Sequence, residues 1–175
     1  FFAARLDRAI ALRHDVLHLN TGPNAAYRVV FSEADGLSGM VADRFGEFAT
    51  VQFTSLALAQ RKEMLGELLR DKLRVRGVYV RTERGIGTLE GLELHDGLLT
   101  GEAPPAEVEF EENGLRFAVN LTEGQKTGYY LDQRDNRAAV AKLSAGRRVL
   151  DAFSYSGGFG LYAAKGGAAA VECVD

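Results

Sequence analysis

The chain has 175 residues, 46% of them hydrophobic, which suits one globular domain or two small ones. Its formal net charge of −3 at pH 7 excludes a strongly basic nucleic-acid binder. The single cysteine, Cys173, excludes an internal disulfide framework and a multi-cysteine metal site, and it favours a reducing, cytoplasmic compartment. No apolar run is long enough to span a bilayer, so we expect no membrane insertion.

The first part of the chain predicts a small layer of helices and strands. Helical spacing of apolar residues indicates a helix over residues 5–17 and a longer one over residues 55–73. Strands are expected at residues 27–31 and 78–80, and a hairpin at residues 40–45 and 48–53 turns around Gly46 and Glu47. His14 and His18 share a helix face, but two histidines without a third ligand predict no metal site.

A change of composition separates the two parts. Residues 85–106 are rich in glycine and contain Pro104 and Pro105, so they predict a loop with a domain joint near residues 101–106. We place a linker helix and an α/β central domain at residues 1–104 and a second, incomplete domain at residues 105–175. The second domain opens with a hairpin, because Asn113-Gly114 separates two runs of alternating apolar residues.

The end of the chain reads as one βαβ unit. A helix over residues 132–143 precedes a strand at 148–152, a glycine-rich turn, a helix near 159–165 and a second strand at 170–174. The fold class predicted is α/β: a small α+β central domain, a β-hairpin and the first βαβ unit of a Rossmann-like domain. Two parallel strands need further βα units to cover both faces, so we expect the natural protein to continue beyond Asp175.

The glycine-rich turn predicts a cofactor site. Asp151 ends the first strand, Gly157 and Gly158 follow, and Asp175 ends the second strand. In S-adenosylmethionine sites of this type the first acid orients the cofactor's ammonium group, the glycines admit it close to the backbone, and the second acid accepts hydrogen bonds from the ribose. The alternative is a tight strand-to-helix turn whose glycines serve packing alone and bind no ligand. The strand, glycine turn, helix, second strand and terminal acid together favour the cofactor site.

A dinucleotide site is the rival interpretation. Gly158-x-Gly160-x-x-Ala163 fits the G-x-G-x-x-A pattern, and Asp175 follows at a plausible distance. The glycines should open the turn directly after the strand, but Phe153-Ser154-Tyr155-Ser156 intervene, and the Asp151 carboxylate would face the pyrophosphate. A nicotinamide dinucleotide therefore ranks second.

The start of the helix over residues 132–143 is open to two interpretations. Gln133 and Arg134 are placed to bond a small polar ligand near the helix start. Alternatively, the turn is exposed, Asp132 caps the helix and Arg137 lies in solvent.

Two runs of residues carry a resemblance to a known family. Lys126-Thr127-Gly128-Tyr129-Tyr130-Leu131-Asp132-Gln133-Arg134-Asp135-Asn136-Arg137, followed by Asp151-x-Phe153-x-Tyr155-x-Gly157-Gly158-Phe159, resembles bacterial S-adenosylmethionine-dependent methyltransferases of large-subunit ribosomal RNA. These enzymes typically modify cytosine C5 and carry an N-terminal PUA domain. Residues 35–46 resemble their central domain, so the resemblance covers nearly the whole chain.

The resemblance implies a fragment of such an enzyme, with S-adenosylmethionine as cofactor and ribosomal RNA as partner; a homodimer is also envisaged. The PUA domain would precede Phe1, and the cysteine that attacks the base would follow Asp175. We therefore assign no catalytic residue, expect the fragment alone to be inactive, and predict that Cys173 is a small buried strand residue. The implied cofactor-binding residues are Asp151, Phe153, Tyr155, Gly157, Gly158 and Asp175, with Gln133 and Arg134 as helpers.

Basic residues gather in two segments despite the acidic total. Such clusters can contact phosphate, although a solvated mixed surface is as good an explanation for any one of them. A non-catalytic RNA-binding module is therefore a third hypothesis, beside the methyltransferase and an NAD-type oxidoreductase. The clustered residues are Arg5, Arg8, Arg13 and Arg28 in the first segment, and Lys126, Arg134, Arg137, Lys142, Arg147 and Arg148 in the second.

Overall fold

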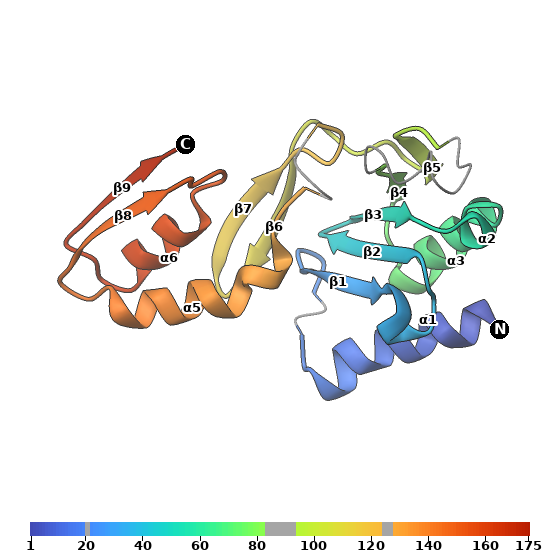
Figure 1. The fold of residues 1–175 in the computed structure, drawn as a ribbon, viewed down its shortest axis with the longest axis horizontal. Helices are drawn as coiled ribbons and strands as arrows, with labels where there is room; N and C mark the ends of the chain where they lie inside the picture. Colours follow the sequence, from blue (N-terminus) through green and yellow to red (C-terminus); the bar gives the residue numbers. More distant parts are fainter. Residues whose placement is uncertain (20–21, 83–93, 124–127) are drawn as a thin grey trace. The chain divides into compact units, whose positions relative to one another are not determined.

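The computed structural model describes residues 1–19, 22–82, 94–123 and 128–175, and the chain forms two compact units, residues 1–129 and 130–175 (Figure 1). No helix in these described ranges is both long and apolar enough to cross a membrane. Lys126 and Thr127 of the motif, and residues 85–93 of the loop predicted at residues 85–106, lie outside the described residues.

The first unit is built on a five-stranded sheet in the order β1-β2-β3-β4-β5. Neighbouring strands are antiparallel except β3 and β4, which are parallel. The strands are β1 (Ala26–Phe31), β2 (Met40–Phe45), β3 (Phe48–Phe53), β4 (Gly77–Val80) and β5 (Gly97–Gly101). The helices are α1 (Phe2–Ala11) with its π-helical extension η1 (Leu12–Val16), the 3₁₀ turn η2 (Ser32–Asp35), α2 (Leu56–Ala59) and α3 (Lys62–Leu73).

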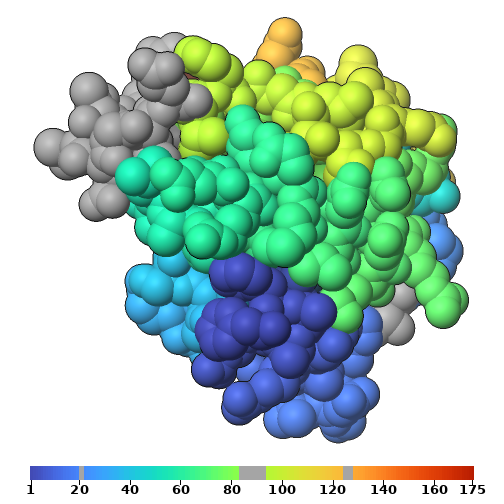
Figure 2. Space-filling view, turned by 90° about the vertical axis from the view of Figure 1, so that its right-hand side faces the viewer, coloured from blue at the N-terminus to red at the C-terminus, as the bar shows by residue number. Residues whose placement is uncertain are grey.

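Apolar residues of the helices and the sheet form the core of this unit. Leu6 of α1 and Leu65 and Leu69 of α3 are fully buried among the side chains of β1–β4. Helix α1 packs against β1, η2 and α3, and Figure 2 shows it in dark blue on this face of the unit. Helical periodicity thus predicted the helical conformation of α1 and α3, because each buries one apolar stripe.

Two details of this unit differ from the prediction. The helix expected over residues 55–73 is divided at Gln60 and Arg61, where the Arg61 amide bonds the Leu58 carbonyl in a tighter turn. Residues 97–101, expected within a loop, form the edge strand β5 on β4. Neither change carries a sequence signal: no glycine or proline marks the break, and β5 is bounded by glycines and lacks clear alternation.

A second hairpin, β6 (Val108–Glu112) and β7 (Leu115–Val119), confirms the Asn-Gly prediction. Asn113 and Gly114 both have positive φ, 50° and 73°, as the predicted tight turn requires. Phe110 packs on Phe45 of β2 with ring centroids 5.7 Å apart. Because this contact joins the hairpin to the first sheet, the units divide at residues 129/130 and not at the predicted 104/105.

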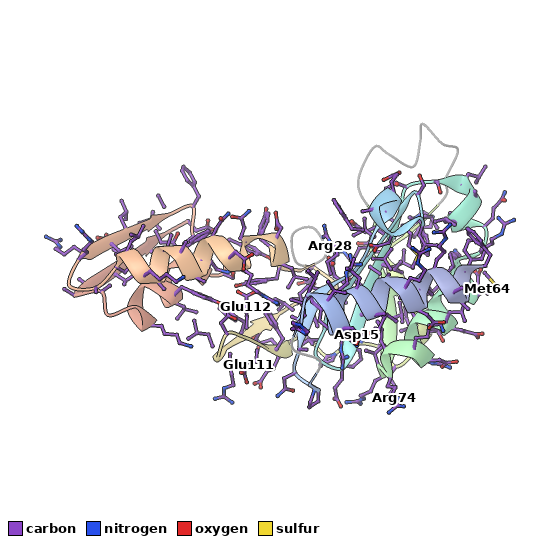
Figure 3. All side chains as sticks on the ribbon, turned by 90° about the horizontal axis from the view of Figure 1, so that it is seen from below. Asp15, Arg28, Met64, Arg74, Glu111 and Glu112 are labelled. Carbon is purple, nitrogen blue, oxygen red and sulfur yellow. The ribbon has the colours of Figure 1, made fainter. Side chains whose placement is uncertain are left out.

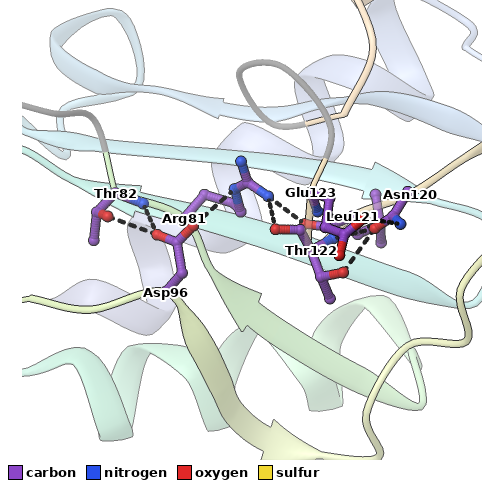
Figure 4. A network of polar contacts seen from close by, with 7 residues as sticks. All are labelled: Arg81, Thr82, Asp96, Asn120, Leu121, Thr122 and Glu123. Carbon is purple, nitrogen blue, oxygen red and sulfur yellow. Dashed lines mark hydrogen bonds and ion pairs between the residues drawn. The ribbon is translucent and has the colours of Figure 1, made fainter.

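Among the arginines of the first unit, Arg28 and Arg81 each bind more than one polar atom. Arg28 on β1, labelled in Figure 3, donates to both carboxylate oxygens of the fully buried Asp43 at 2.8 and 3.0 Å. Arg81, directly after β4, donates to the carbonyls of Leu121 (3.0 Å) and Thr122 and pairs with Asp96 at 3.4 Å (Figure 4). The Arg81 network thereby fixes the chain just after β7.

The second unit is the predicted βαβ arrangement. Strands β8 (Arg148–Ala152) and β9 (Ala170–Val174) pair in parallel, and the connecting helix α6 (Gly158–Lys165) packs on both strands and on α5 (Arg134–Leu143). The short 3₁₀ turn η3 (Leu131–Gln133) leads into α5. The α/β fold class is confirmed.

Candidate functional site

The turn between β8 and α6 has an unusual backbone. Phe153, Tyr155 and Gly157 all have positive φ, at 61°, 48° and 67°. Such angles are strained for the two aromatic residues, so surrounding contacts must hold them. The Ser154 amide donates to the Val174 carbonyl at 3.0 Å, and the Gly157 amide donates to the Ser154 carbonyl at 2.8 Å. The turn is therefore a defined structure and not an irregular loop.

Asp151 lies at the carboxyl end of β8 and is 9% exposed. Its Oδ2 atom accepts a hydrogen bond from the Gly160 amide at 2.8 Å, across the turn. That amide belongs to the first turn of α6, where backbone N–H groups and the helix dipole favour a negative charge. The carboxylate is thus oriented by the backbone of the helix that follows it.

Asp175 follows the last residue of β9. In the parallel register Asp151 is opposite Cys173, so Asp175 lies two residues further along the same edge. Asp175 Oδ1 accepts a hydrogen bond from the Tyr155 amide at 3.1 Å. The structure thus places the two predicted acids at the ends of adjacent strands, and one residue of the turn bonds directly to the second acid.

The glycines of the turn have different roles. At Gly157, with φ of 67°, no atom of the described residues beyond its chain neighbours lies within 4 Å of the position that a Cβ would occupy, so this part of the structure leaves open space there. Gly158 is buried as the first residue of α6. A Cβ on Gly160 would meet the Cys173 Sγ at 2.5 Å, so this glycine lets α6 pack on β9. Gly158 and Gly160 therefore lie inside the helix, whereas a dinucleotide motif needs its first glycine in the turn.

Gln133 and Arg134 lie where η3 passes into α5. The Gln133 side chain accepts a hydrogen bond from Asn136 at 2.9 Å and donates to Asp132 at 3.3 Å, so its bonds stay local. The alternative in which Asp132 caps this helix is wrong, since Gln133 occupies the N-cap position and α5 has no side-chain cap bond. Arg134 is half-buried as the first residue of α5.

Arg137 is the site residue whose placement the sequence did not predict. The alternative that put it in solvent is wrong: it is 2% exposed. Its Nη2 donates to the Tyr130 carbonyl at 3.0 Å, and its guanidinium carbon lies 6.0 Å from the ring centroids of both Phe159 and Tyr162. The sequence around Arg137 contains no signal for this burial, because Phe159 and Tyr162 come from the distant helix α6.

Two further expectations change with the structure. The second basic segment does not form one surface, because Arg137 is buried while Arg147 and Arg148 are exposed at the start of β8, away from Asp151 at its end. Cys173 is exposed and not buried as predicted. Within the described residues β9 pairs only with β8, which leaves its other edge open.

Comparison with known proteins agrees with this geometry. Residues 97–175 match the model of a family described as S-adenosylmethionine-dependent methyltransferase. The chain is 45% identical over 175 residues to a Photobacterium profundum protein named ribosomal RNA large subunit methyltransferase I, and 41% identical over 175 residues to an Escherichia coli protein of the same name. In each case the whole chain is aligned to 44% of the relative, so the chain spans less than half the length of these relatives.

Solved structures show the same fold. A protein from Streptococcus mutans, described as an S-adenosylmethionine-dependent methyltransferase, superposes with a TM-score of 0.82 at 27% identity, covering 99% of this chain and 44% of that one. The tRNA m1G37 methyltransferase of M. jannaschii superposes with a TM-score of 0.61 at 18% identity, covering 99% of this chain and 44% of that one, which shows the fold alone. The predicted cofactor, S-adenosylmethionine, is confirmed as that of the matching family. Over residues 97–175, the chain is thus similar to the family of S-adenosylmethionine-dependent methyltransferases.

Proposed function

We propose that the whole protein transfers the methyl group of S-adenosylmethionine to cytosine C5 of large-subunit ribosomal RNA. The observation that carries the cofactor assignment is the pair of carboxylates, Asp151 and Asp175, at the ends of adjacent parallel strands beside a positive-φ turn that is open over Gly157. The names of the relatives support ribosomal RNA as the substrate. The cytosine C5 target rests on the resemblance carried by residues 126–137 and 151–159.

The residues of the turn suit the parts of this cofactor. Asp151, oriented by the Gly160 amide, is placed to accept a hydrogen bond from an ammonium group, and Asp175 from ribose hydroxyls. Gly157 and Gly158 admit the ligand close to the backbone. Phe153, which is 92% exposed, and the half-buried Tyr155 supply apolar contact surface. We keep Gln133 and Arg134 as secondary contacts near the start of α5.

Bound S-adenosylmethionine supplies an electrophilic methyl group. Methylation at cytosine C5 would also need a cysteine thiolate that adds to C6 of the base, so that C5 becomes nucleophilic, and a base that afterwards removes the C5 proton so that the thiolate leaves C6. Cys173 lies within β9 at the packing contact with Gly160, and we do not assign it that role. The PUA domain and the homodimer remain predictions for the whole protein, and its mass in solution tests the second of them.

The dinucleotide alternative is disfavoured by the position of Asp151. Its carboxylate bonds the first turn of α6, which is where a pyrophosphate would have to bind in a dinucleotide site. A non-catalytic RNA-binding module predicts RNA affinity with a steep salt dependence and no cofactor binding. Titration with each ligand separates the three hypotheses.

The direct test of the substrate is a methylation assay. The whole protein is incubated with isotopically labelled S-adenosylmethionine and unmodified ribosomal RNA, and the RNA is digested to nucleosides for mass spectrometry. Labelled 5-methylcytidine is the expected product. Label only in a methylguanosine would contradict cytosine as the target but support RNA methyltransferase activity. Absence of label in the RNA would contradict both the cytosine target and RNA methyltransferase activity.

A further inference from the structure

Arg137 is a buried cation that the proposed cofactor contacts do not explain. A guanidinium with 2% exposure is costly to bury unless hydrogen bonds and aromatic faces replace its water. Here Nη2 donates to the Tyr130 carbonyl at 3.0 Å, and the guanidinium lies 6.0 Å from the rings of Phe159 and Tyr162. Arg137 on α5 therefore contacts two other segments, the chain before η3 and helix α6.

Tyr130, whose carbonyl Arg137 binds, is in contact with the strained turn. The Tyr130 ring packs edge-on against Tyr155, with centroids 6.0 Å apart and planes at 87°. Tyr155 has a φ of 48°, and its amide donates to Asp175. The contacts thus run from Arg137 through Tyr130 and Tyr155 to the carboxylate proposed to bind ribose, entirely within residues 130–175.

We propose that Arg137 is a positioning residue of the cofactor site: by fixing the backbone at Tyr130 it holds Tyr155 in its left-handed conformation, with the amide directed at Asp175. The role in binding rests on the proposed function, whereas the effect on the turn does not. A left-handed tyrosine is unfavourable on its own, so removal of its support lets the turn relax to commoner angles. Relaxation withdraws the amide that orients Asp175.

A purely structural role makes a different prediction. If Arg137 only fills space between α5 and α6, its loss lowers the stability of the whole unit. Amide hydrogen exchange in the ligand-free turn is then accelerated no more than exchange in α5 and α6. Arg137→Met removes the charge and keeps most of the volume. Arg148→Met is the matched control, because Arg148 is an exposed arginine of the same unit at the far end of β8.

The first experiment needs no ligand. Amide hydrogen exchange is measured in the whole protein for both variants. We expect exchange at residues 153–157 to be accelerated in Arg137→Met with α5 and α6 unchanged, and no acceleration in Arg148→Met. Unchanged exchange in the turn, or equal acceleration through both helices, would overturn the proposal. If Arg137→Met does not fold, Arg137→Lys replaces it, since lysine keeps the charge but not the fork of donors.

The second experiment measures binding of S-adenosylhomocysteine by calorimetry. We expect Arg137→Met to weaken binding about 10-fold, as the loss of a charged hydrogen bond implies. Because Arg137 acts through Tyr155, the double variant Arg137→Met/Tyr155→Leu should bind no more weakly than the worse single variant. Additive losses would contradict the route through Tyr155. If the unaltered protein binds no S-adenosylhomocysteine, the proposed function fails, and the exchange experiment still decides whether Arg137 holds the turn.

Discussion

The carboxylate of Asp151 accepts a hydrogen bond from the backbone amide of Gly160. The effect of its negative charge on binding can therefore be measured separately from the effect of its hydrogen bond. Asp151→Asn keeps an oxygen that can accept the Gly160 amide and removes the negative charge. We expect affinity for S-adenosylmethionine to fall about 10-fold or more, because the proposed charge-assisted bond to the ammonium is lost. Calorimetric titration measures this; unchanged affinity with unchanged stability would show that Asp151 only caps α6.

Gly157 and Gly146 form a matched pair for testing whether the cofactor lies close to the backbone at Gly157. Both have positive φ, 67° and 69°, and both have open space around a Cβ. Alanine at either position should cost about 1 kcal/mol of unfolding free energy through backbone strain. Only Gly157→Ala should also weaken binding of S-adenosylmethionine, because only Gly157 lies in the proposed site. Equal affinities in the two variants would remove Gly157 from the site.

Glu33, which lies outside the candidate site, allows a test of how stability depends on pH. Hydrogen bonds from Ser32 and Ser38 lower the pKa of Glu33 from 4.5 to about 2. A carboxylate with a lowered folded-state pKa stabilises the protein above pH 4.5, and that contribution is lost as the pH falls towards 2. Ser38→Ala should therefore be less stable than the unaltered protein in urea at pH 7, with a gap that narrows below pH 4.5. In a Glu33→Gln background the gap should not change with pH.

At the scale of elements, the Arg81 network ties the end of β4 to the chain after β7. Arg81→Met should cost about 2 kcal/mol of unfolding free energy, because a largely buried cation loses charged hydrogen bonds. Arg76 is the control, since its ion pairs with Glu47 and Glu102 are on the surface and its side chain is 51% exposed. Arg76→Met should cost clearly less, because solvent screens surface pairs. Urea unfolding distinguishes the two, and equal losses would mean that the network contributes no more than a surface pair.

The elements that the sequence predicted correctly are those with local signals. The β2–β3 hairpin, the Asn113-Gly114 hairpin and the βαβ unit follow from alternation, turn residues and helical spacing. Edge strand β5 was missed because its pairing with β4 is not encoded in its own glycine-bounded sequence. The break between α2 and α3 was missed for the same reason, since tertiary packing decides it.

The positions of the candidate site residues were predicted in part. Strand ends and glycines located Asp151, Gly157 and Asp175, because parallel strands bring their carboxyl ends to one edge. The burial of Arg137 was not predictable from helix spacing, since it depends on aromatic residues from α6 and on the carbonyl of Tyr130. The bond from Gly160 to Asp151 depends likewise on the position at which α6 begins.

At the scale of the whole molecule, the chain combines a five-stranded unit and a βαβ unit, and the latter contains every residue predicted to bind the cofactor. The central claim is that this second unit binds S-adenosylmethionine. The most direct test is calorimetric titration of the whole protein with S-adenosylmethionine and, separately, with NAD. Micromolar binding of S-adenosylmethionine without binding of NAD is the predicted result. Binding of NAD alone, or of neither ligand, would contradict it.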